Sequence, residues 1–234
     1  MARTGLILAI AALAAVSAAQ AQAGAGPVTL YATQPGKPAL DADPHGGNPF
    51  ATALISALER PGEDPKAVLR TQTLANSGNE QQPDLGGLAP GATLAPDAGE
   101  QAIALVLVFA DYGSDLGLIS LPGAAFDAAR VTAALQAAGY ATEMVIARDA
   151  AQYRASLAEF RETSAAADRA LVYTTGHGVE AGATVYLVAP DFERLVSPRR
   201  EDISITLPEV AAALQARDTN LLVYAGCRDN PLEW

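Results

Sequence analysis

The sequence contains a single cysteine, Cys227, among 234 residues. An internal disulfide is therefore excluded, and the thiol is either buried and inert, linked to another chain, or a nucleophile. Basic residues are also scarce, with 15 Lys and Arg against 26 Asp and Glu and a formal net charge of -11. Because phosphate binding needs clustered Lys and Arg, we do not expect a nucleic-acid partner, whereas a basic ligand suits the charge.

The apolar run near the N-terminus is too short to span a bilayer. It extends from Leu6 to Val16, follows Arg3 and is followed by the small residues SAAQAQAG. This pattern is typical of a signal peptide with cleavage after Ala23 or Ala21. No cysteine directly follows the run, so the segment lacks the residue that would carry a lipid anchor. We therefore expect a secreted or periplasmic protein that is not bound to a membrane once residues 1–23 are removed.

From residue 101 onward, strand and helix patterns alternate. Half of all residues are hydrophobic, which suffices for one domain with a core. The alternation predicts an α/β fold, a mostly parallel sheet flanked by helices on both faces, with its site at the carboxyl ends of the strands. Strands are expected at 103–109, 142–146, 169–174, 184–190 and 220–225, and helices at 123–139, 149–165 and 206–217.

The N-terminal part shows one strand pattern, at 28–33, and two helix starts, at Asn48-Pro49 and Asp64-Pro65. One strand and two helices cannot bury a core alone, so they must pack on the rest of the chain. We divide the chain into a signal peptide (1–23), a first half (24–85), a linker (86–100) and a second half (101–234). Residues 24–234 are expected to form one structural domain.

His177 and Cys227 each follow a predicted strand directly. Adjacent parallel strands would bring both residues to the same edge of the sheet. A thiolate is a nucleophile, and an imidazole can support its ionisation and protonate a leaving amine. The N–H groups of Gly178 and Cys227 are then candidate oxyanion donors. The alternatives are a packed histidine in a tight turn and a buried thiol at a strand end.

Several segments resemble the caspase/metacaspase superfamily of cysteine peptidases, in its bacterial caspase-like branch. The 50 residues that separate His177 from Cys227 are also typical of caspase-type proteases. The resemblance implies a caspase-like fold and a cysteine endopeptidase with His177 and Cys227 as its catalytic dyad. The segments that carry it are LVLVFADYGS, LPGAAFDAA, VYTTGHG, VYLVAPD and LLVYAGCRDNP.

The two halves of the family's domain stand in reversed order. The small-subunit half follows the nucleophile in the family, but YATQPGKPALD and GGNPFATALISAL resemble that half and come first here. We interpret the order as a circular permutation, with the new termini in an exposed loop and residues 86–100 as the new joint. A mis-assembled gene, or two chains that complete each other, are the alternative explanations.

The resemblance also implies three substrate-binding residues. Asp127 is the acid of the family's helix start, and Thr175 is the small hydroxyl residue two before His177. Asp41 stands where caspases that cut after aspartate carry an arginine. Together they favour Arg or Lys at P1, the residue before the cleaved bond, although Ala225 replaces a further acid of the metacaspases. The alternatives are that Asp127 caps or solvates a helix start and that Asp41 is a turn residue.

We expect no cofactor and no metal. Related metacaspases often need calcium, but the sequence shows no clear loop for it. The expected partner is a peptide or protein substrate, and the sequence does not predict an oligomeric state. The alternative function, from a different class, is a non-catalytic caspase-like module that binds basic peptides without cutting them.

Overall fold

The computed structural model describes residues 26–44, 46–113, 118–192 and 203–230. The expected signal peptide therefore lies outside the described residues. The strands are β1 (Val28–Tyr31), β2 (Ala102–Val108), β3 (Ala141–Ile146), β4 (Arg169–Thr175), β5 (Gly178–Ala181), β6 (Thr184–Val188), β7 (Ser204–Thr206) and β8 (Thr219–Tyr224). The helices are α2 (Pro49–Leu58), α3 (Pro65–Asn76), α4 (Pro122–Ala137), α5 (Ala150–Ser164) and α7 (Leu207–Ala211).

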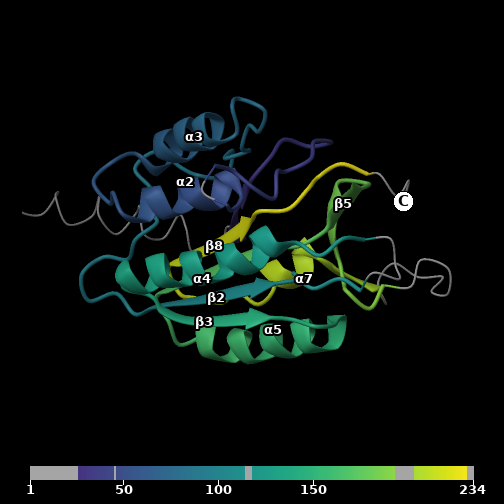
Figure 1. Ribbon diagram of the computed structural model, residues 1–234. Helices are drawn as coiled ribbons and strands as arrows, with labels where there is room; N and C mark the ends of the chain where they lie inside the picture. The colour runs from purple at the N-terminus through teal and green to yellow at the C-terminus, as the bar shows by residue number, and fades with distance from the viewer. Residues whose placement is uncertain (1–25, 45, 114–117, 193–202, 231–234) are drawn as a thin grey trace, which may run out of the picture.

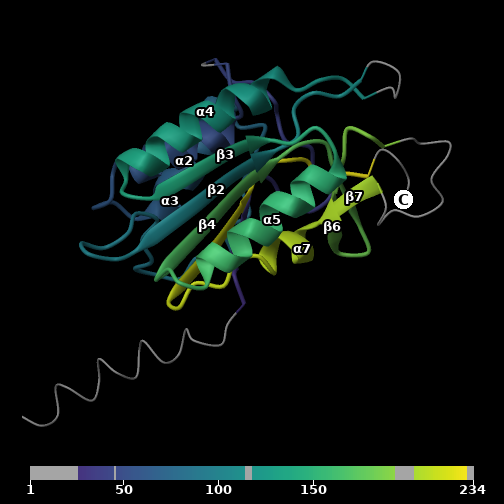
Figure 2. The ribbon, with the colours of Figure 1, turned by 90° about the horizontal axis from the view of Figure 1, so that it is seen from below.

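Five parallel strands form the main sheet, in the order β1-β8-β4-β2-β3. Helices α2, α3 and α4 lie on one face and α5 and α7 on the other (Figures 1 and 2). The expected mostly parallel sheet with helices on both faces is confirmed. None of the helices in the described part of the chain is long and apolar enough to cross a membrane.

A second, antiparallel sheet of β5, β6 and β7 follows the main sheet's β4. The sequence pattern predicted only one strand in this region, at 184–190, and missed β5 and β7. Both are short, at four and three residues, and too brief to show an apolar alternation. This small sheet matters for the site because β5 begins directly after His177.

The predicted helix starts are confirmed in atomic detail. Asn48 accepts hydrogen bonds from Phe50 N and Ala51 N, and Thr206 forms a capping box with Glu209. The helix expected at 206–217 is shorter, however, because α7 ends at Ala211. The Ser164 hydroxyl donates to Ala213 O and accepts from Gln215 N, which satisfies the backbone there without further helix.

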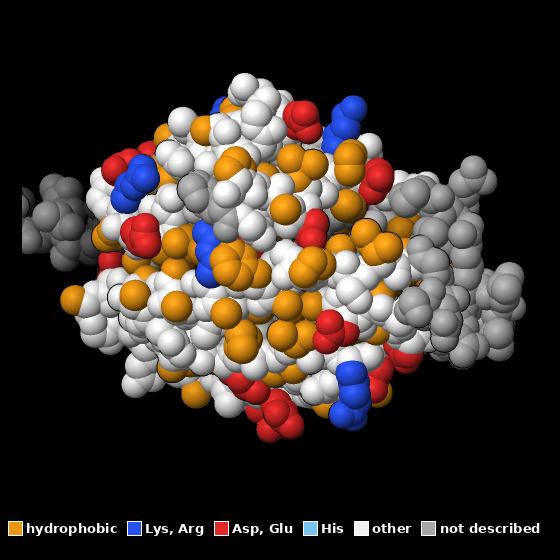
Figure 3. Space-filling model, viewed as in Figure 1, with side chains coloured by type: hydrophobic (Ala, Val, Ile, Leu, Met, Phe, Trp, Pro, Cys, Tyr) orange, Lys and Arg blue, Asp and Glu red, His pale blue; other side chains and the backbone are white. Residues whose placement is uncertain are grey.

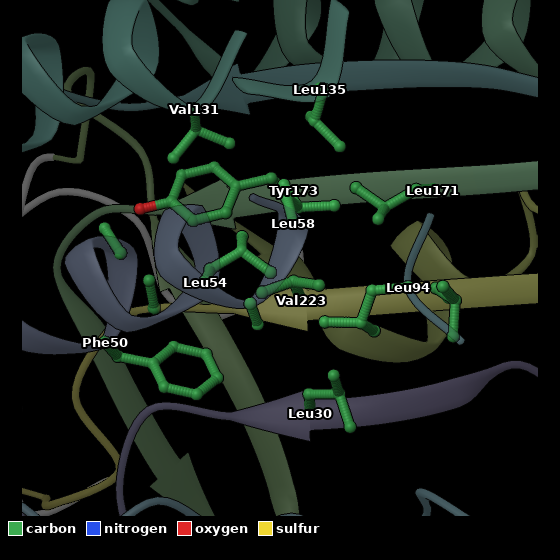
Figure 4. Close-up of a cluster of buried hydrophobic side chains, with 14 of the residues drawn as sticks. Leu30, Phe50, Leu54, Leu58, Leu94, Val131, Leu135, Leu171, Tyr173 and Val223 are labelled. Carbon is green, nitrogen blue, oxygen red and sulfur yellow. The ribbon is translucent and has the colours of Figure 1, made fainter. Parts of the chain in front are cut away.

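The central strand β4 is buried at all seven positions, with alternate side chains facing opposite layers. Tyr173 and Leu171 face α2 and α4, while Val172 and Ala170 face α5 and α7. The first of these layers is drawn in Figure 4, where Tyr173 lies among side chains of α2, α4 and β8. Packing on both faces gives the loops that follow β4 and β8 a rigid base.

Strand β1 lies beside β8, although the two are far apart in the sequence. Val28 is in register with Leu221 and Tyr31 with Tyr224. The pairing continues past the strand, since Ala32 N donates to Tyr224 O at 2.9 Å. The N-terminal segment is therefore hydrogen-bonded to the strand that leads into Cys227.

Candidate active site

The loops that carry His177 and Cys227 touch at the edge where the parallel strands end. Ala225 N donates to Thr174 O at 2.9 Å, which continues the pairing of β8 with β4. A Cβ atom on Gly226 would lie 2.8 Å from Gly176 O, and one on Gly178 would lie 2.6 Å from Cys227 O. Glycine at these positions therefore permits an approach of the two backbones that a side chain would prevent.

His177 is oriented by neighbours on two sides. Its Nε2 lies 2.8 Å from the carbonyl oxygen of Ile119, and because a carbonyl only accepts, Nε2 carries the hydrogen. In the neutral ring, Nδ1 then has the free lone pair. Tyr112 packs against the imidazole edge-on, with ring centres 4.5 Å apart. The Tyr112 hydroxyl also accepts from His177 N and donates to Val188 O, at 3.0 and 2.9 Å.

Cys227 is held by the backbone of the N-terminal segment. Ala39 N donates to Cys227 Sγ at 3.3 Å, and the thiol donates to Ala39 O at 3.6 Å. The Tyr224 hydroxyl donates to Cys227 O at 2.7 Å. Burial raises the pKa of the thiol, the charges of Asp229 and Asp41 raise it further, and the Ala39 N–H opposes them. In this conformation the thiol is protonated at neutral pH.

Asp41 contacts the start of α4 and interacts electrostatically with His177 and Cys227. Its Oδ2 accepts from Gly123 N at 3.3 Å, in the first turn of a helix whose N-cap, Leu121, makes no side-chain hydrogen bond. Burial raises the pKa of Asp41, against the effects of the Gly123 N–H and the charge of His177. Asp41 is therefore a half-buried carboxylate beside His177 as well as the cap of α4.

Asp127 is completely buried and both of its oxygens are bonded. Oδ2 accepts from Asn48 N at 2.7 Å and Oδ1 accepts from Arg130 Nη1 at 3.1 Å. Burial raises the pKa of Asp127 to about 7, although both of these partners lower it. Asn48 also donates through Nδ2 to Ala225 O at 3.2 Å, so it links Asp127 to the strand end that precedes Cys227.

The structure thus brings His177, Gly178, Cys227 and Asp41 together at one edge of the sheet. The other two candidates, Thr175 and Asp127, are buried. Thr175 is the last residue of β4 and is 7% exposed, whereas Asp127 is inaccessible. The buried Tyr173 hydroxyl has no hydrogen-bond partner among the residues that the structure describes. Burial raises its pKa, and the charges of Asp127 and Asp41 raise it further, which places this unpaired polar atom near both acids.

Asp127 leads to a testable expectation for the pH dependence of stability. Because its pKa is raised from 3.8 to about 7 in the folded protein, its contribution is fully present below pH 4 and is lost as the pH rises to 7. Between pH 4 and pH 7, the free energy of unfolding of the wild type should fall by up to about 4 kcal/mol relative to Asp127→Asn. Urea denaturation at several pH values measures the difference.

The control for this measurement is Glu162→Gln, which alters an exposed carboxylate on α5. The difference in the free energy of unfolding between Glu162→Gln and the wild type should change little between pH 4 and pH 7. If the difference in the free energy of unfolding between the wild type and Asp127→Asn stays constant with pH, Asp127 has the same proton affinity in the folded and unfolded chains.

Sequence reasoning missed four residues that contact His177 and Cys227. Ala39 and Ile119 contact Cys227 and His177 through backbone atoms, so the identity of their side chains does not indicate these contacts in the sequence. Tyr112 lies just after the strand predicted at 103–109, and Tyr224 lies within the strand predicted at 220–225. Their hydroxyls bond to His177 N and Cys227 O, contacts that depend on two loops meeting in space. Of these four residues, only Tyr224 could have been suspected from the sequence, because it stands three residues before the cysteine.

A cavity of about 780 Å³ lies at the opposite edge of the sheet, where the strands begin. It is lined by residues such as Val28, Asp97, Asp168 and Leu221 and adjoins the buried ion pair of Arg169. It does not include His177 or Cys227. Within the described ranges, no group of three or more His, Cys, Asp or Glu side chains could hold a metal ion.

The exposed large hydrophobic side chains include two near the candidate site. Ile119 is 75% exposed and Phe126 is 47% exposed, whereas Met144 and Ile146 belong to the edge strand β3. Figure 3 shows hydrophobic side chains over the middle of the face viewed in Figure 1, with charged residues between them. The His177 side of the site therefore adjoins an apolar side chain, that of Ile119.

Comparison with known proteins gives one family match. Residues 101–201 match the model of the caspase domain, peptidase family C14. The matched range contains His177 and Asp127 and ends before Cys227. No curated protein matched the chain. Together with the parallel sheet and its two helical layers, the match supports the caspase-like superfamily. Over residues 101–201, the chain is similar to the caspase domain of cysteine peptidases.

Proposed function

We propose that the protein is a caspase-like cysteine endopeptidase with Cys227 as nucleophile and His177 as its proton-transfer partner. The observation that carries the proposal is the contact between the Gly176–Gly178 loop and the Gly226–Cys227 loop at the carboxyl ends of adjacent strands. This contact supports the proposal because thiol peptidases need a thiol and an imidazole on neighbouring parts of the structure. The family match of residues 101–201 supports the same class of enzyme.

The proposed reaction begins when the thiol leaves Ala39 and gives its proton to Nδ1 of His177. The thiolate attacks the peptide carbonyl carbon, and a tetrahedral oxyanion forms. The oxyanion is stabilised by the N–H groups of Gly178 and Cys227. When the C–N bond breaks, His177 returns the proton to the leaving amine and an acyl-thioester remains. Water, deprotonated by His177, then hydrolyses the thioester and restores the thiol.

The proposed P1 preference is for Arg or Lys. The half-buried Asp41 carboxylate lies beside His177 and can attract a basic side chain at the entrance of the site. Thr175, at the end of β4, would lie nearer the end of that side chain, whereas the fully buried Asp127 and Tyr173 would contact it only if the protein opened locally. Arg130 already occupies one oxygen of Asp127, which leaves Asp127 less able to bind an arginine by paired hydrogen bonds.

We also propose that the chain is a circularly permuted and exported member of the superfamily. The pairing of β1 with β8 supports the permutation, because β1 lies where the chain that follows the nucleophile would continue in the family. The hydrogen bond from Arg228 N to Lys37 O, at 2.9 Å, extends that contact beyond the strands. The N-terminal sequence pattern supports export to the periplasm or the exterior.

A second function, peptide binding without cleavage, is favoured by one specific observation. The thiol is engaged with Ala39 and its pKa is raised, whereas reactive cysteines have a lowered pKa. In a binding module this contact would be permanent. In the proposed enzyme, the substrate backbone replaces Ala39 at the thiol.

A panel of fluorogenic peptides that carry Arg, Lys or Asp at P1 distinguishes the two functions. We expect the wild type to cleave after Arg and Lys, at least tenfold faster than after Asp. Protein with Cys227→Ala, purified in the same way, gives the background of contaminating proteases. Binding of the basic peptides without cleavage, measured by fluorescence anisotropy, would establish the module instead. Cleavage that is equal in both preparations would exclude Cys227 as the nucleophile.

A further inference from the structure

The arginine that follows the nucleophile is almost completely buried and has partners in three segments. Arg228 is 7% exposed, and its Nε and Nη2 donate to the two oxygens of Glu180 at 2.8 and 3.3 Å. Its Nη1 donates to Asp84 Oδ2 at 3.1 Å and to Thr33 O at 3.3 Å. The guanidinium carbon also lies 4.1 Å from the centre of the Tyr31 ring. One side chain thus joins β5, the end of β1 and the segment around Asp84.

The backbone on either side of this arginine makes the same connections. Arg228 N donates to Lys37 O at 2.9 Å, and Gly36 N donates to Arg228 O at 3.0 Å. Glu180 N donates to Asp229 O at 3.1 Å. The residues next to Cys227 are therefore bonded both to the N-terminal segment and to β5.

Glu180 lies three residues after His177, on the strand that begins at Gly178. A bidentate pair between a guanidinium and a carboxylate fixes direction as well as distance, because two parallel hydrogen bonds must form together. The pair between Arg228 and Glu180 therefore limits how far the loop of Cys227 can shift from the loop of His177. Buried ion pairs add little net stability compared with apolar packing.

We propose that Arg228 is a positioning residue that fixes the loop of Cys227 relative to the loop of His177 and to the N-terminal segment. It does not touch the substrate. Its bonds to Glu180 and Asp84 fix the backbone from which the thiol, once released from Ala39, reaches the imidazole. The kinetic part of this inference rests on the proposed peptidase function, whereas the structural part does not.

Arg169 provides a matched control. It forms a buried ion pair with Glu100 at 3.0 Å, with side chains 6 and 13% exposed, against 8 and 15% for Arg228 and Glu180. Like Arg228, it also donates to a backbone carbonyl, that of Thr93. Arg169 lies at the other end of the sheet, so Arg169→Met and Arg228→Met remove similar interactions at different distances from the dyad.

The experiment compares both variants in kinetics and in amide hydrogen exchange. Arg228→Met should lower kcat about 100-fold and change KM less than threefold, because a displacement of about 1 Å in reacting groups has an effect of this size. Exchange should rise at least tenfold both in residues 176–181 and in residues 225–230. Arg169→Met should show a similar fall in Tm without either change. Glu180→Gln, which keeps the shape of the side chain, should reproduce part of the loss if Arg228→Met folds poorly.

Each outcome decides the proposal. Equal losses of kcat in Arg228→Met and Arg169→Met, in proportion to their stability, would overturn it, as would increased exchange in the Cys227 loop alone. If the wild type cleaves no peptide, the proposed function fails and the exchange measurements alone test the positioning role. In that case, coupled exchange of both loops would still support Arg228 as the residue that joins them.

Discussion

Cys227→Ala and His177→Ala are each expected to lower kcat for peptide cleavage by at least about 1,000-fold. Without the thiol, no covalent intermediate forms. Without the imidazole, the thiol loses its proton acceptor, and burial together with the nearby carboxylates keeps its pKa high. The measurement should use the peptide that the wild type cleaves best. Circular dichroism and gel filtration should show that each variant is folded to the same extent as the wild type.

The double variant tests whether the two residues act as one unit. Because attack by the thiolate and proton transfer belong to the same step, Cys227→Ala with His177→Ala should be no slower than Cys227→Ala alone. A further drop in the double variant would show that His177 acts independently of Cys227, for example on water. Full activity of His177→Ala would leave the thiolate without its proposed partner and contradict the dyad.

Gly178→Ala is expected to have the second largest effect. A Cβ atom there would collide with the Tyr224 hydroxyl and lie 2.6 Å from Cys227 O. Tyr224 is fully buried and its hydroxyl is bonded to the same carbonyl, so it has no free direction in which to move. We expect kcat/KM to fall at least about 100-fold and the free energy of unfolding to fall by about 2–3 kcal/mol.

Two further variants test whether the collision of the added Cβ atom causes the effect of Gly178→Ala. Tyr224→Phe in the same chain removes the colliding oxygen, so stability should partly recover while activity stays low, because Cys227 O has lost its donor. Gly62→Ala, between α2 and α3, adds a Cβ atom that meets nothing within 4 Å and should change neither property. If Gly178→Ala and Gly62→Ala behave alike, the close approach of the two catalytic loops has no functional role. Thermal denaturation and steady-state kinetics provide both measurements.

Much of the fold could be predicted from the sequence because its signals are local. The fully apolar run at 103–109 and the caps at Asn48 and Thr206 depend on neighbouring residues, and the structure has the elements they predicted. The strands β5 and β7 were missed because they are short and form by pairing with β6. The end of α7 was placed too late because it depends on Ser164, which lies far from it in the sequence.

The candidate site was predictable only in part for the same reason. His177 and Cys227 stand at strand ends, which the sequence shows, and the parallel pairing of β4 with β8 explains why the loops that carry them meet. The partner of Asp127, by contrast, was not evident, since Asn48 N comes from a loop 79 residues away. Whether Asp127 is open to a substrate or bonded within the protein depends on such contacts, which no local pattern encodes.

The hydrogen bond between Ala39 and Cys227 joins residues 188 positions apart, and it therefore bears on when the candidate site forms. Strand β1 is synthesised well before its neighbour β8, because most of the described chain lies between them. Contacts between such distant segments form late in folding, because a long loop must close first. The edge that carries His177 and Cys227 is thus assembled only after β8 has been made, so under the proposed function a nascent chain that still lacks β8 would not cleave peptides.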